Sequence, residues 1–327
     1  MRRRPIAVGL VGLIALPRFA LAQPAPARAL RRVGVLAPST REREEVTLKP
    51  FFDQMKALGW IEGQTVAYDR AYADDQHAEM PRLAAELVAR APEVIYAPPA
   101  PAAGVAQAAT KTIPIVFGTS VDPIGSGLVA TLARPGGNVT GISSIADSLA
   151  PKRVQMLRQI LPNAQRIGLL GDPADPTLRI EYAALQPLLP SLGIATVRAD
   201  ASNPVEFDAA VKRLLDANVD AILIESAFAF NMRFRLFELL SGRRIPVVGH
   251  RAQMADAGAL FAYGASLSEQ LRRSALLVDK ILRGARPADT PVELPDKFEL
   301  VVNLKAARAL GIALPTSVVL RADRVIE

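Results

Sequence analysis

The chain has 327 residues, 50% of them hydrophobic and 22% charged, which predicts a globular protein of about two domains. Its formal net charge of +7 falls to +3 without the four arginines that precede residue 23, and the remaining lysines and arginines are interspersed with acids, so we expect no nucleic-acid partner. The absence of cysteine excludes disulfides, a thiolate nucleophile, cysteine metal sites and the lipid-anchored N-terminus of bacterial lipoproteins.

The first 22 residues have the pattern of a secretory signal peptide. Three arginines, Arg2 to Arg4, precede an apolar stretch over Ile6–Leu16, and Ala20-Leu21-Ala22 provides a small-residue cleavage site. This stretch is too short to cross about 30 Å of hydrocarbon, which argues against a membrane anchor. We expect export to the periplasm with cleavage after Ala22, by the general or the twin-arginine route, and a flexible leader over 23–30.

Short apolar runs alternate with stretches of helical periodicity after the leader. The expected strands are 33–37, 66–72, 94–97 and 113–117, and the expected helices are 48–58, 78–90 and 102–110. Gly59 follows the first helix, where a glycine commonly ends a helix in a left-handed conformation. Strands that alternate with helices predict βαβ units and a parallel sheet.

The second half of the chain repeats the first at an offset of about 130 residues. Arg32–Leu36 recurs as Arg166–Leu170, and Leu58-Gly59 recurs as Leu192-Gly193. Strands are expected again at 166–170, 195–199, 221–225 and 246–249, with helices at 178–192, 204–217 and 233–240. A repeat of this length is longer than a solenoid unit of roughly 20–50 residues. It predicts two similar α/β lobes with a ligand-binding cleft between them.

The last third of the chain does not form a third copy. It predicts strands over 258–263 and 298–303 and helices over 267–282 and 304–310. We expect this tail to complete both lobes, with crossings near 141–147, 262–266 and 285–297 that act as a hinge. The first lobe is then 31–142 plus about 264–288, and the second is 143–263 plus about 289–327. The predicted fold class is α/β, with two doubly wound parallel-sheet lobes joined by a multi-crossover hinge.

Signatures of catalysis are absent from the sequence. There is no G-x-S-x-G or Walker A motif, and the two histidines, His77 and His250, have no metal-ligand partner at helical spacing. Gly125–Ala130 matches the G-x-G-x-x-A dinucleotide pattern but does not follow the first strand of its lobe, so we interpret it as a loop that enters a short helix. We expect no catalytic residue, metal or cofactor.

The most specific motif spans the end of the first copy. Ile113–Phe117 leads into Asp122–Val129 and then into the ten-residue run Leu132–Gly141. This segment resembles the signature IPIVF…DPVGxGLVxSLARPGGNVTG of the ABC-transporter substrate-binding proteins with the type I periplasmic-binding fold. The tail agrees at Val278–Leu282 and Lys297–Lys305, so the resemblance covers residues 31–327.

The resemblance implies a periplasmic receptor that delivers a small solute to an inner-membrane ABC permease. Its relatives include receptors for aromatic amino acids, so the expected solute is small and polar or zwitterionic, such as an amino acid or an aromatic or amide compound. We expect a monomer without enzymatic activity. An exported α/β enzyme that uses Asp122, Glu225 or His250, and a sensory binding protein that serves another receptor, remain the alternatives.

Candidate ligand residues follow the carboxyl ends of the expected strands. In the first lobe, hydroxyls and backbone N–H groups near helix N-termini favour an anionic group. Asp122 either pairs with an ammonium or closes a turn, and Tyr263 either stacks on the solute or packs at the hinge. From the second lobe, Asp172, Glu225 and Ser226 are expected to close over the solute. The full candidate set is Ser39, Thr40, Ala100, Thr119, Ser120, Asp122, Thr140, Asp172, Glu225, Ser226 and Tyr263.

One loop departs from the family pattern. Relatives commonly carry a Gly-Thr-Pro-Ala-like turn after the third strand, and the matching stretch here is Pro98–Ala102, with Ala100 at its centre. The glycine and the hydroxyl are both replaced. We therefore expect a stiff, apolar pocket wall at this loop, which puts a carboxylate-binding contact there in doubt, so the solute need not be an ordinary α-amino acid.

Overall fold

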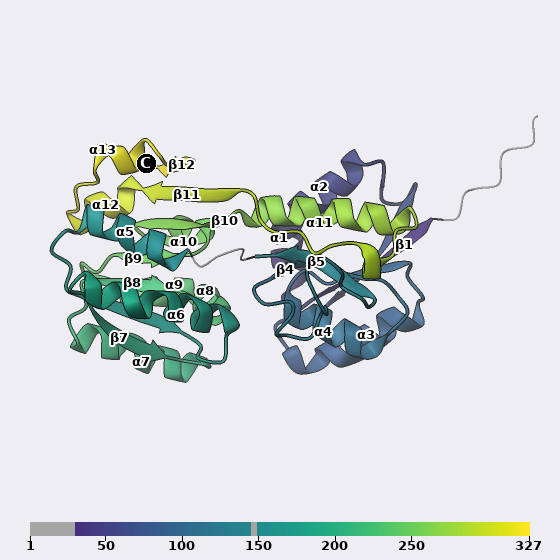
Figure 1. Ribbon diagram of the computed structural model, residues 1–327, viewed down its shortest axis with the longest axis horizontal. Helices are drawn as coiled ribbons and strands as arrows, with labels where there is room; N and C mark the ends of the chain where they lie inside the picture. Colours follow the sequence, from purple (N-terminus) through teal and green to yellow (C-terminus); the bar gives the residue numbers. More distant parts are fainter. Residues whose placement is uncertain (1–29, 145–148) are drawn as a thin grey trace, which may run out of the picture.

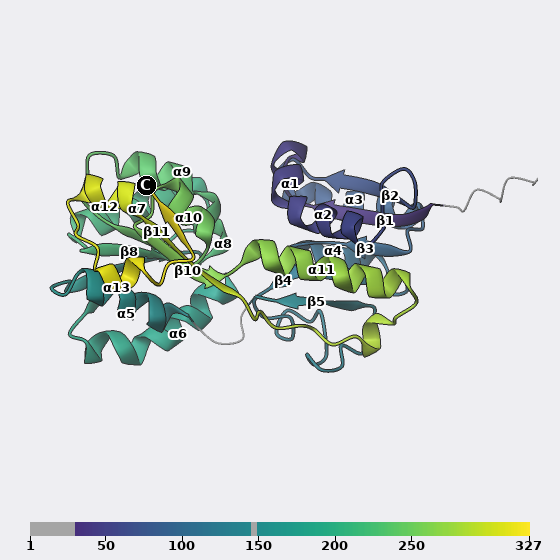
Figure 2. The same ribbon diagram turned by 90° about the horizontal axis from the view of Figure 1, so that it is seen from above.

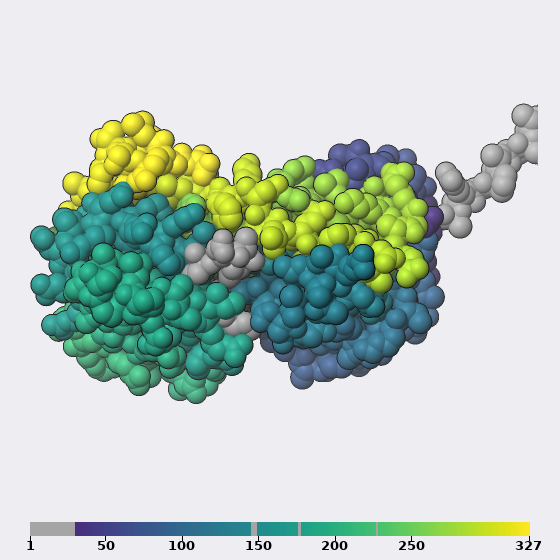
Figure 3. All heavy atoms as spheres, in the orientation of Figure 1, coloured from purple at the N-terminus to yellow at the C-terminus, as the bar shows by residue number. Residues whose placement is uncertain are grey.

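The computed structural model describes residues 30–144 and 149–327, which form two α/β lobes side by side (Figure 1). The predicted signal peptide and the leader up to residue 29 lie outside these ranges. Among the described residues, no helix is both long and apolar enough to span a bilayer. The surface narrows to a waist between the lobes, and the C-terminal part of the chain passes across it (Figure 3).

The first lobe is built on a five-stranded parallel sheet with strand order β2-β1-β3-β4-β5. Helices α2 and α11 pack on one face of this sheet, and α3 and α4 pack on the other. The elements are β1 (Arg31–Ala37), α1 (Arg41–Thr47), α2 (Lys49–Ala57), β2 (Val66–Tyr72), η1 (His77–Glu79), α3 (Met80–Ala89), β3 (Val94–Tyr96), α4 (Ala100–Ala109), β4 (Ile115–Ser120), β5 (Val139–Ser143), α11 (Leu267–Leu282) and η2 (Pro287–Asp289).

The second lobe has a seven-stranded sheet with order β12-β11-β10-β9-β8-β6-β7. Helices α5, α6, α12 and α13 cover one face, and α7 to α10 cover the other. The elements are α5 (Ala150–Ile160), β6 (Arg166–Gly171), α6 (Pro176–Ser191), β7 (Ala195–Asp200), α7 (Pro204–Asp216), β8 (Ala221–Ile224), α8 (Ala227–Asn231), α9 (Arg233–Leu239), β9 (Val247–Gly249), α10 (Ala252–Ala257), β10 (Phe261–Ala265), β11 (Phe298–Asn303), α12 (Leu304–Leu310), α13 (Thr316–Val319) and β12 (Arg324–Ile326).

The internal repeat corresponds to a structural repeat. The order β2-β1-β3-β4 in the first sheet matches β7-β6-β8-β9 in the second. A glycine at the centre of each leading strand faces a buried leucine of the covering helix. A Cβ on Gly34 would lie 3.5 Å from Leu87, and one on Gly168 would lie 2.8 Å from Leu214. The repeated glycine therefore allows a helix to lie close against each sheet.

The tail departs from a purely parallel arrangement. Strand β11 runs antiparallel to β10, because the chain returns from the first lobe before it forms β11. Strand β12 then adds parallel to β11 at the edge of the sheet. The periodicity of the sequence did not indicate β12, which has only three residues.

The chain passes between the lobes three times: from β5 toward α5, from β10 into α11, and from η2 into β11 (Figures 1 and 2). The second and third passages lie side by side, because Ser266 donates its N–H to the Lys297 carbonyl at 3.0 Å. The chain leaves the first lobe later than the expected residue 288. Glu293 still exchanges backbone hydrogen bonds with Gly141 and Ser143, at 3.0 and 2.8 Å.

We expect Gly264→Ala to destabilise the protein by about 1–3 kcal/mol, because the added Cβ would collide with the carbonyl of His250. The matched control is Gly104→Ala in α4, where no atom lies within 4 Å of the added carbon. Removing a helical glycine should leave stability unchanged or raise it by up to about 1 kcal/mol. Thermal unfolding of both variants measures the difference, and equal melting temperatures would contradict the argument.

Candidate functional site

The carboxyl ends of the parallel strands in both sheets face the gap between the lobes, and a pocket lies there. In open α/β sheets, ligands bind outside these ends, where the strand order reverses. The reversals occur between β1 and β3 and between β6 and β8. The pocket is lined from both lobes and from the crossing segment by Val121, Ser144, Leu149, Arg153, Glu181, His250, Arg251, Gly264, Ala265, Leu267 and Gln270.

The first lobe brings several of its predicted residues to this edge. Ser39 and Thr40 follow β1, and Thr40 precedes α1 in an extended conformation without a capping hydrogen bond from its side chain. Ala100 begins α4 directly after the proline turn, and the Thr119 N–H donates to the Pro98 carbonyl at 2.9 Å. The hydroxyl of Thr119 also bonds that of Ser144, a residue of the pocket wall. Loops after β1, β3 and β4 thus share one edge.

Two other predicted ligand residues form hydrogen bonds within the first lobe. The Asp122 carboxylate accepts the Gly125 N–H at 2.7 Å, which supports the interpretation that Asp122 closes a turn after β4. Thr140 is completely buried, and its hydroxyl donates to the Thr290 carbonyl at 2.8 Å. This hydroxyl therefore holds the returning tail against β5.

In the second lobe, Asp172 and Ser226 meet across the strand reversal. The Ser226 hydroxyl oxygen accepts the Asp172 N–H at 3.1 Å and the Ala229 N–H at 3.2 Å, so it also caps α8. The Asp172 carboxylate accepts the hydroxyl of Ser202 at 2.8 Å. Each of these side chains has a structural partner, and Asp172 is only half-buried at the cleft side of β6.

Glu225 belongs to a buried ionic cluster. Its carboxylate receives two hydrogen bonds from Arg153, at 2.5 and 3.1 Å, and both side chains are 1% exposed. Arg153 also pairs with Glu181 at 3.1 Å and donates to the Tyr263 carbonyl at 2.9 Å. Burial and the second carboxylate raise the pKa of Glu225 to about 8, although Arg153 opposes the shift. The cluster joins α5, α6, β8 and β10, and its Arg153 and Glu181 also line the pocket.

Tyr263 points into the second lobe. Its half-buried ring packs against the hydrophobic core that includes α5 and α6, 6.4 Å from the ring of Phe298. This geometry supports hinge packing for its side chain.

Several residues of the pocket wall were not among the predicted ligand residues. His250 and Arg251 directly follow β9, while Gln270 lies in the first turns of α11. The position of Arg251 after a strand end was a usable signal. Arg153 could also have been recognised from the sequence, because it shares the buried face of α5 with Val154 and Leu157, where a charged residue is unusual. No sequence pattern distinguishes Gln270.

His250 is held neutral. Its Nδ1 lies 2.9 Å from the Ile224 carbonyl oxygen, so this nitrogen carries the proton and donates. Burial, together with repulsion from Arg251 and Arg153, lowers the pKa of His250 to about 3. An imidazole with this pKa is a poor general base at neutral pH. Among the described residues, no group of three potential metal ligands occurs.

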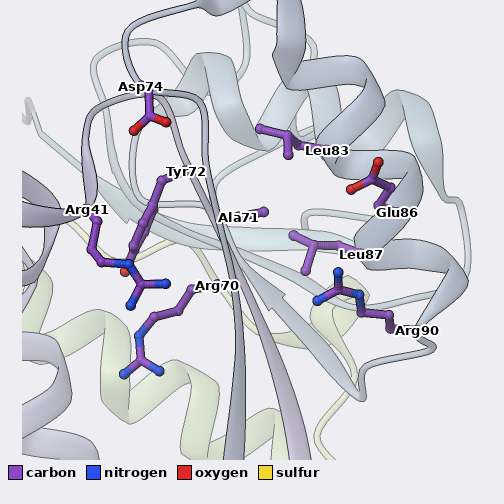
Figure 4. A pocket seen from close by; sticks show the side chains of 9 residues that line it. All are labelled: Arg41, Arg70, Ala71, Tyr72, Asp74, Leu83, Glu86, Leu87 and Arg90. Atoms are coloured by element: carbon purple, nitrogen blue, oxygen red, sulfur yellow. The ribbon is translucent and has the colours of Figure 1, made fainter.

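Two larger hollows lie within the first lobe. One, of about 260 Å³, follows the outer strand β2, with Arg41, Arg70 and Tyr72 near one another and Glu86 and Arg90 projecting from α3 (Figure 4). The other, of about 570 Å³, surrounds Trp60 at the opposite end of the sheet. Both are lined by one lobe only, so a movement of the lobes would not enclose a ligand there.

Comparison with known proteins identifies the family. The family model described as ABC transporter substrate binding protein matches residues 32–326. The chain belongs to this family. This substrate-binding protein is 24% identical over 264 residues to a tyrosine-binding protein of Clostridioides difficile, across 80% of this chain and 75% of that protein.

Solved structures agree with this assignment. An ABC domain from Streptococcus pneumonia in complex with L-Trp is 25% identical, with a TM-score of 0.83, and the match covers 91% of this chain and all of that one. A conserved domain protein from Vibrio cholerae is 28% identical, with a TM-score of 0.80 over 90% of this chain and 99% of that one. The predicted family and two-lobed fold are therefore confirmed.

We expect Glu225→Gln to flatten the pH dependence of stability. The pKa of this carboxyl is higher in the folded protein than in the unfolded chain, where it is 4.5. Its contribution to stability is therefore complete below pH 4.5 and is lost as the pH rises toward 8. Within this pH range, the free energy of unfolding should fall more steeply for the natural protein than for the variant. The two slopes should differ by about 1 kcal/mol per pH unit. Urea denaturation at several pH values tests this, with exposed Glu86→Gln as control. Parallel curves for all three proteins would refute it.

Proposed function

We propose that this protein is the exported receptor of an ABC importer and binds a small amino-acid-like or aromatic solute between two closing lobes. The observation that carries the proposal is the pocket whose wall combines Ser144 of the first lobe, Arg251 of the second and Gln270 next to a crossing. The amino-acid ligands named for the tyrosine-binding protein and for the pneumococcal structure support this solute class.

Closure is supported by the way the lobes are connected. Among the described residues, the extensively contacting pairs of helices and strands belong to the same lobe, and the crossing segments link the lobes. The two crossings tied by Ser266 and Lys297 form a narrow hinge. A solute that touches both walls would favour the closed arrangement, because it gains contacts there that the open one does not offer.

We assign the polar wall of the first lobe to Ser39, Thr40, Thr119 and Ser120. Ser39 and Thr40 follow β1, and Thr119 and Ser120 end β4, at the edge that faces the second lobe. We further infer export with cleavage after Ala22, delivery to an inner-membrane permease, a monomeric state and the absence of turnover. The family consists of solute-binding proteins, which supports the last point.

A panel of amino acids, aromatic acids and small amides should contain a solute that raises the melting temperature. At about 100 times its Kd, such a solute adds about 2.7 kcal/mol of stability. Because the chain has no cysteine, Glu42→Cys and Asn231→Cys can be labelled specifically, and energy transfer between the labels should rise with the same solute. Product formation from the solute, or stabilisation without any change in energy transfer, would contradict the receptor proposal.

Thr40→Val should weaken binding of that solute by about threefold to tenfold, equivalent to one neutral hydrogen bond. The stability of the free protein should barely change, since the Thr40 side chain makes no capping bond. Exposed Thr47→Val, at the other end of α1, is the matched control and should change neither quantity. Calorimetric titration measures affinity, and an unchanged Kd for Thr40→Val would remove this residue from the site.

A further inference from the structure

Two arginines of the second lobe surround one aromatic ring at the cleft. The guanidinium of Arg233 lies 4.5 Å from the ring centres of both Phe230 and Phe234, and it donates to the Phe230 carbonyl at 3.1 Å. The guanidinium of Arg251 lies 5.2 Å from the same Phe230 ring and lines the pocket. The stacking fixes both cations without using up their hydrogen-bond donors.

The positive charge of these arginines is incompletely balanced. Within the described residues, neither Arg233 nor Arg251 forms an ion pair with a carboxylate, whereas Arg153 and Arg235 do. Asp175 is the acid that faces Arg251 and favours its charge. Burial and repulsion from Arg233 nevertheless lower the pKa of Arg251. Burial, together with repulsion from Arg43 of the first lobe across the cleft, likewise lowers the pKa of Arg233.

A buried hydrogen-bond donor faces the same pocket. Gln270 is 4% exposed, and its amide nitrogen has no hydrogen-bond partner among the described residues. It lies in the first turns of α11, next to the crossing from β10. An unpaired buried donor is unfavourable, so this amide favours a solute that places an acceptor atom beside it.

Asp175 favours the charge of Arg251, and the other acids near the cleft bond within the protein. Glu225 and Glu181 bind Arg153, Asp122 closes its turn, and Asp172 accepts from Ser202. The neutral His250 adds no further positive charge. The pocket wall therefore offers hydrogen-bond donors and positive charge to a solute, but it offers few carboxylates that could pair with an ammonium group.

We propose that the solute is a carboxylate without an ammonium group, whose carboxylate binds Arg251 of the second lobe and Gln270 of α11 in the first lobe. The assignment rests on the proposed receptor function and specifies its substrate class. A guanidinium and a carboxylate pair through two parallel N–H···O bonds, and the Gln270 amide supplies a further donor. The opposite end of the solute then faces the first lobe. Pairing of Arg251 with an anion also offsets its repulsion with Arg233.

Matched probes test the charge requirement. Each probe set shares one carbon skeleton and consists of a carboxylate without an ammonium, the corresponding amino acid and the corresponding amide. The aromatic set is 3-phenylpropanoate, L-phenylalanine and 3-phenylpropanamide. The aliphatic set is glutarate, L-glutamate and glutaramide. We expect the carboxylate without an ammonium to bind at least about tenfold more tightly than its two counterparts in at least one set. Tighter binding of the amino acid or the amide, or no binding of any carboxylate at millimolar concentration, would overturn the proposal.

Variants test the two residues. Arg251→Met should weaken binding of the carboxylate probe by about tenfold to hundredfold, and Gln270→Met by a smaller factor. Exposed Arg213→Met on α7 carries the same change of charge away from the cleft and should leave affinity unchanged. Arg251→Lys should recover part of the loss, because it restores the charge but not the paired donors. Equal affinities of Arg251→Met and the natural protein would refute the assignment.

The outcomes separate this inference from the receptor proposal. If L-phenylalanine or L-glutamate binds best and closes the labelled lobes, the receptor function stands and the assignment of a carboxylate without an ammonium group fails. If a carboxylate binds through Arg251 without any change in energy transfer between the lobes, the substrate class stands and the closing receptor fails.

Discussion

The shared direction of the strands determines where this protein can bind a solute. All pairings in the first sheet are parallel, as are those from β7 to β10 in the second, so every loop at a carboxyl end lies at one edge of its lobe. The chain crosses between the lobes at these same edges. Residues as distant in sequence as Ser144 and Gln270 therefore line one pocket, although neither forms a recognisable motif with the other.

Much of the fold was predictable because it depends on local and repeated signals. The repeated glycines Gly34 and Gly168 permit the same close helix–strand contact, so selection for packing leaves the same pattern twice. The family motif over Leu132–Gly141 was equally informative, because its residues shape β5 and the turn before it. The short strand β12 was missed, since three residues carry no measurable periodicity.

The site was less predictable because its side chains take partners from distant parts of the chain. Thr140 occupies a conspicuous motif, but its hydroxyl is used by Thr290, 150 residues away. Glu225 follows a strand end as a ligand residue would, yet its carboxylate is already bound by Arg153 of α5. Position relative to strand ends can be read from sequence. Which hydroxyl or carboxylate already has a partner depends on tertiary packing.

The return of the chain along β5 has a consequence for solubility. A sheet edge with unpaired N–H and C=O groups is a template on which other chains can add strands. On the β5 side of the first lobe, Glu293 bonds Gly141 and Ser143 and also pairs with Arg273 at 2.7 Å, so the tail lies over this edge and is anchored to α11. The segment that leads back to the second lobe thus also covers an edge of the first sheet, and truncating the tail would expose that edge to pairing with other chains as well as remove a connection between the lobes.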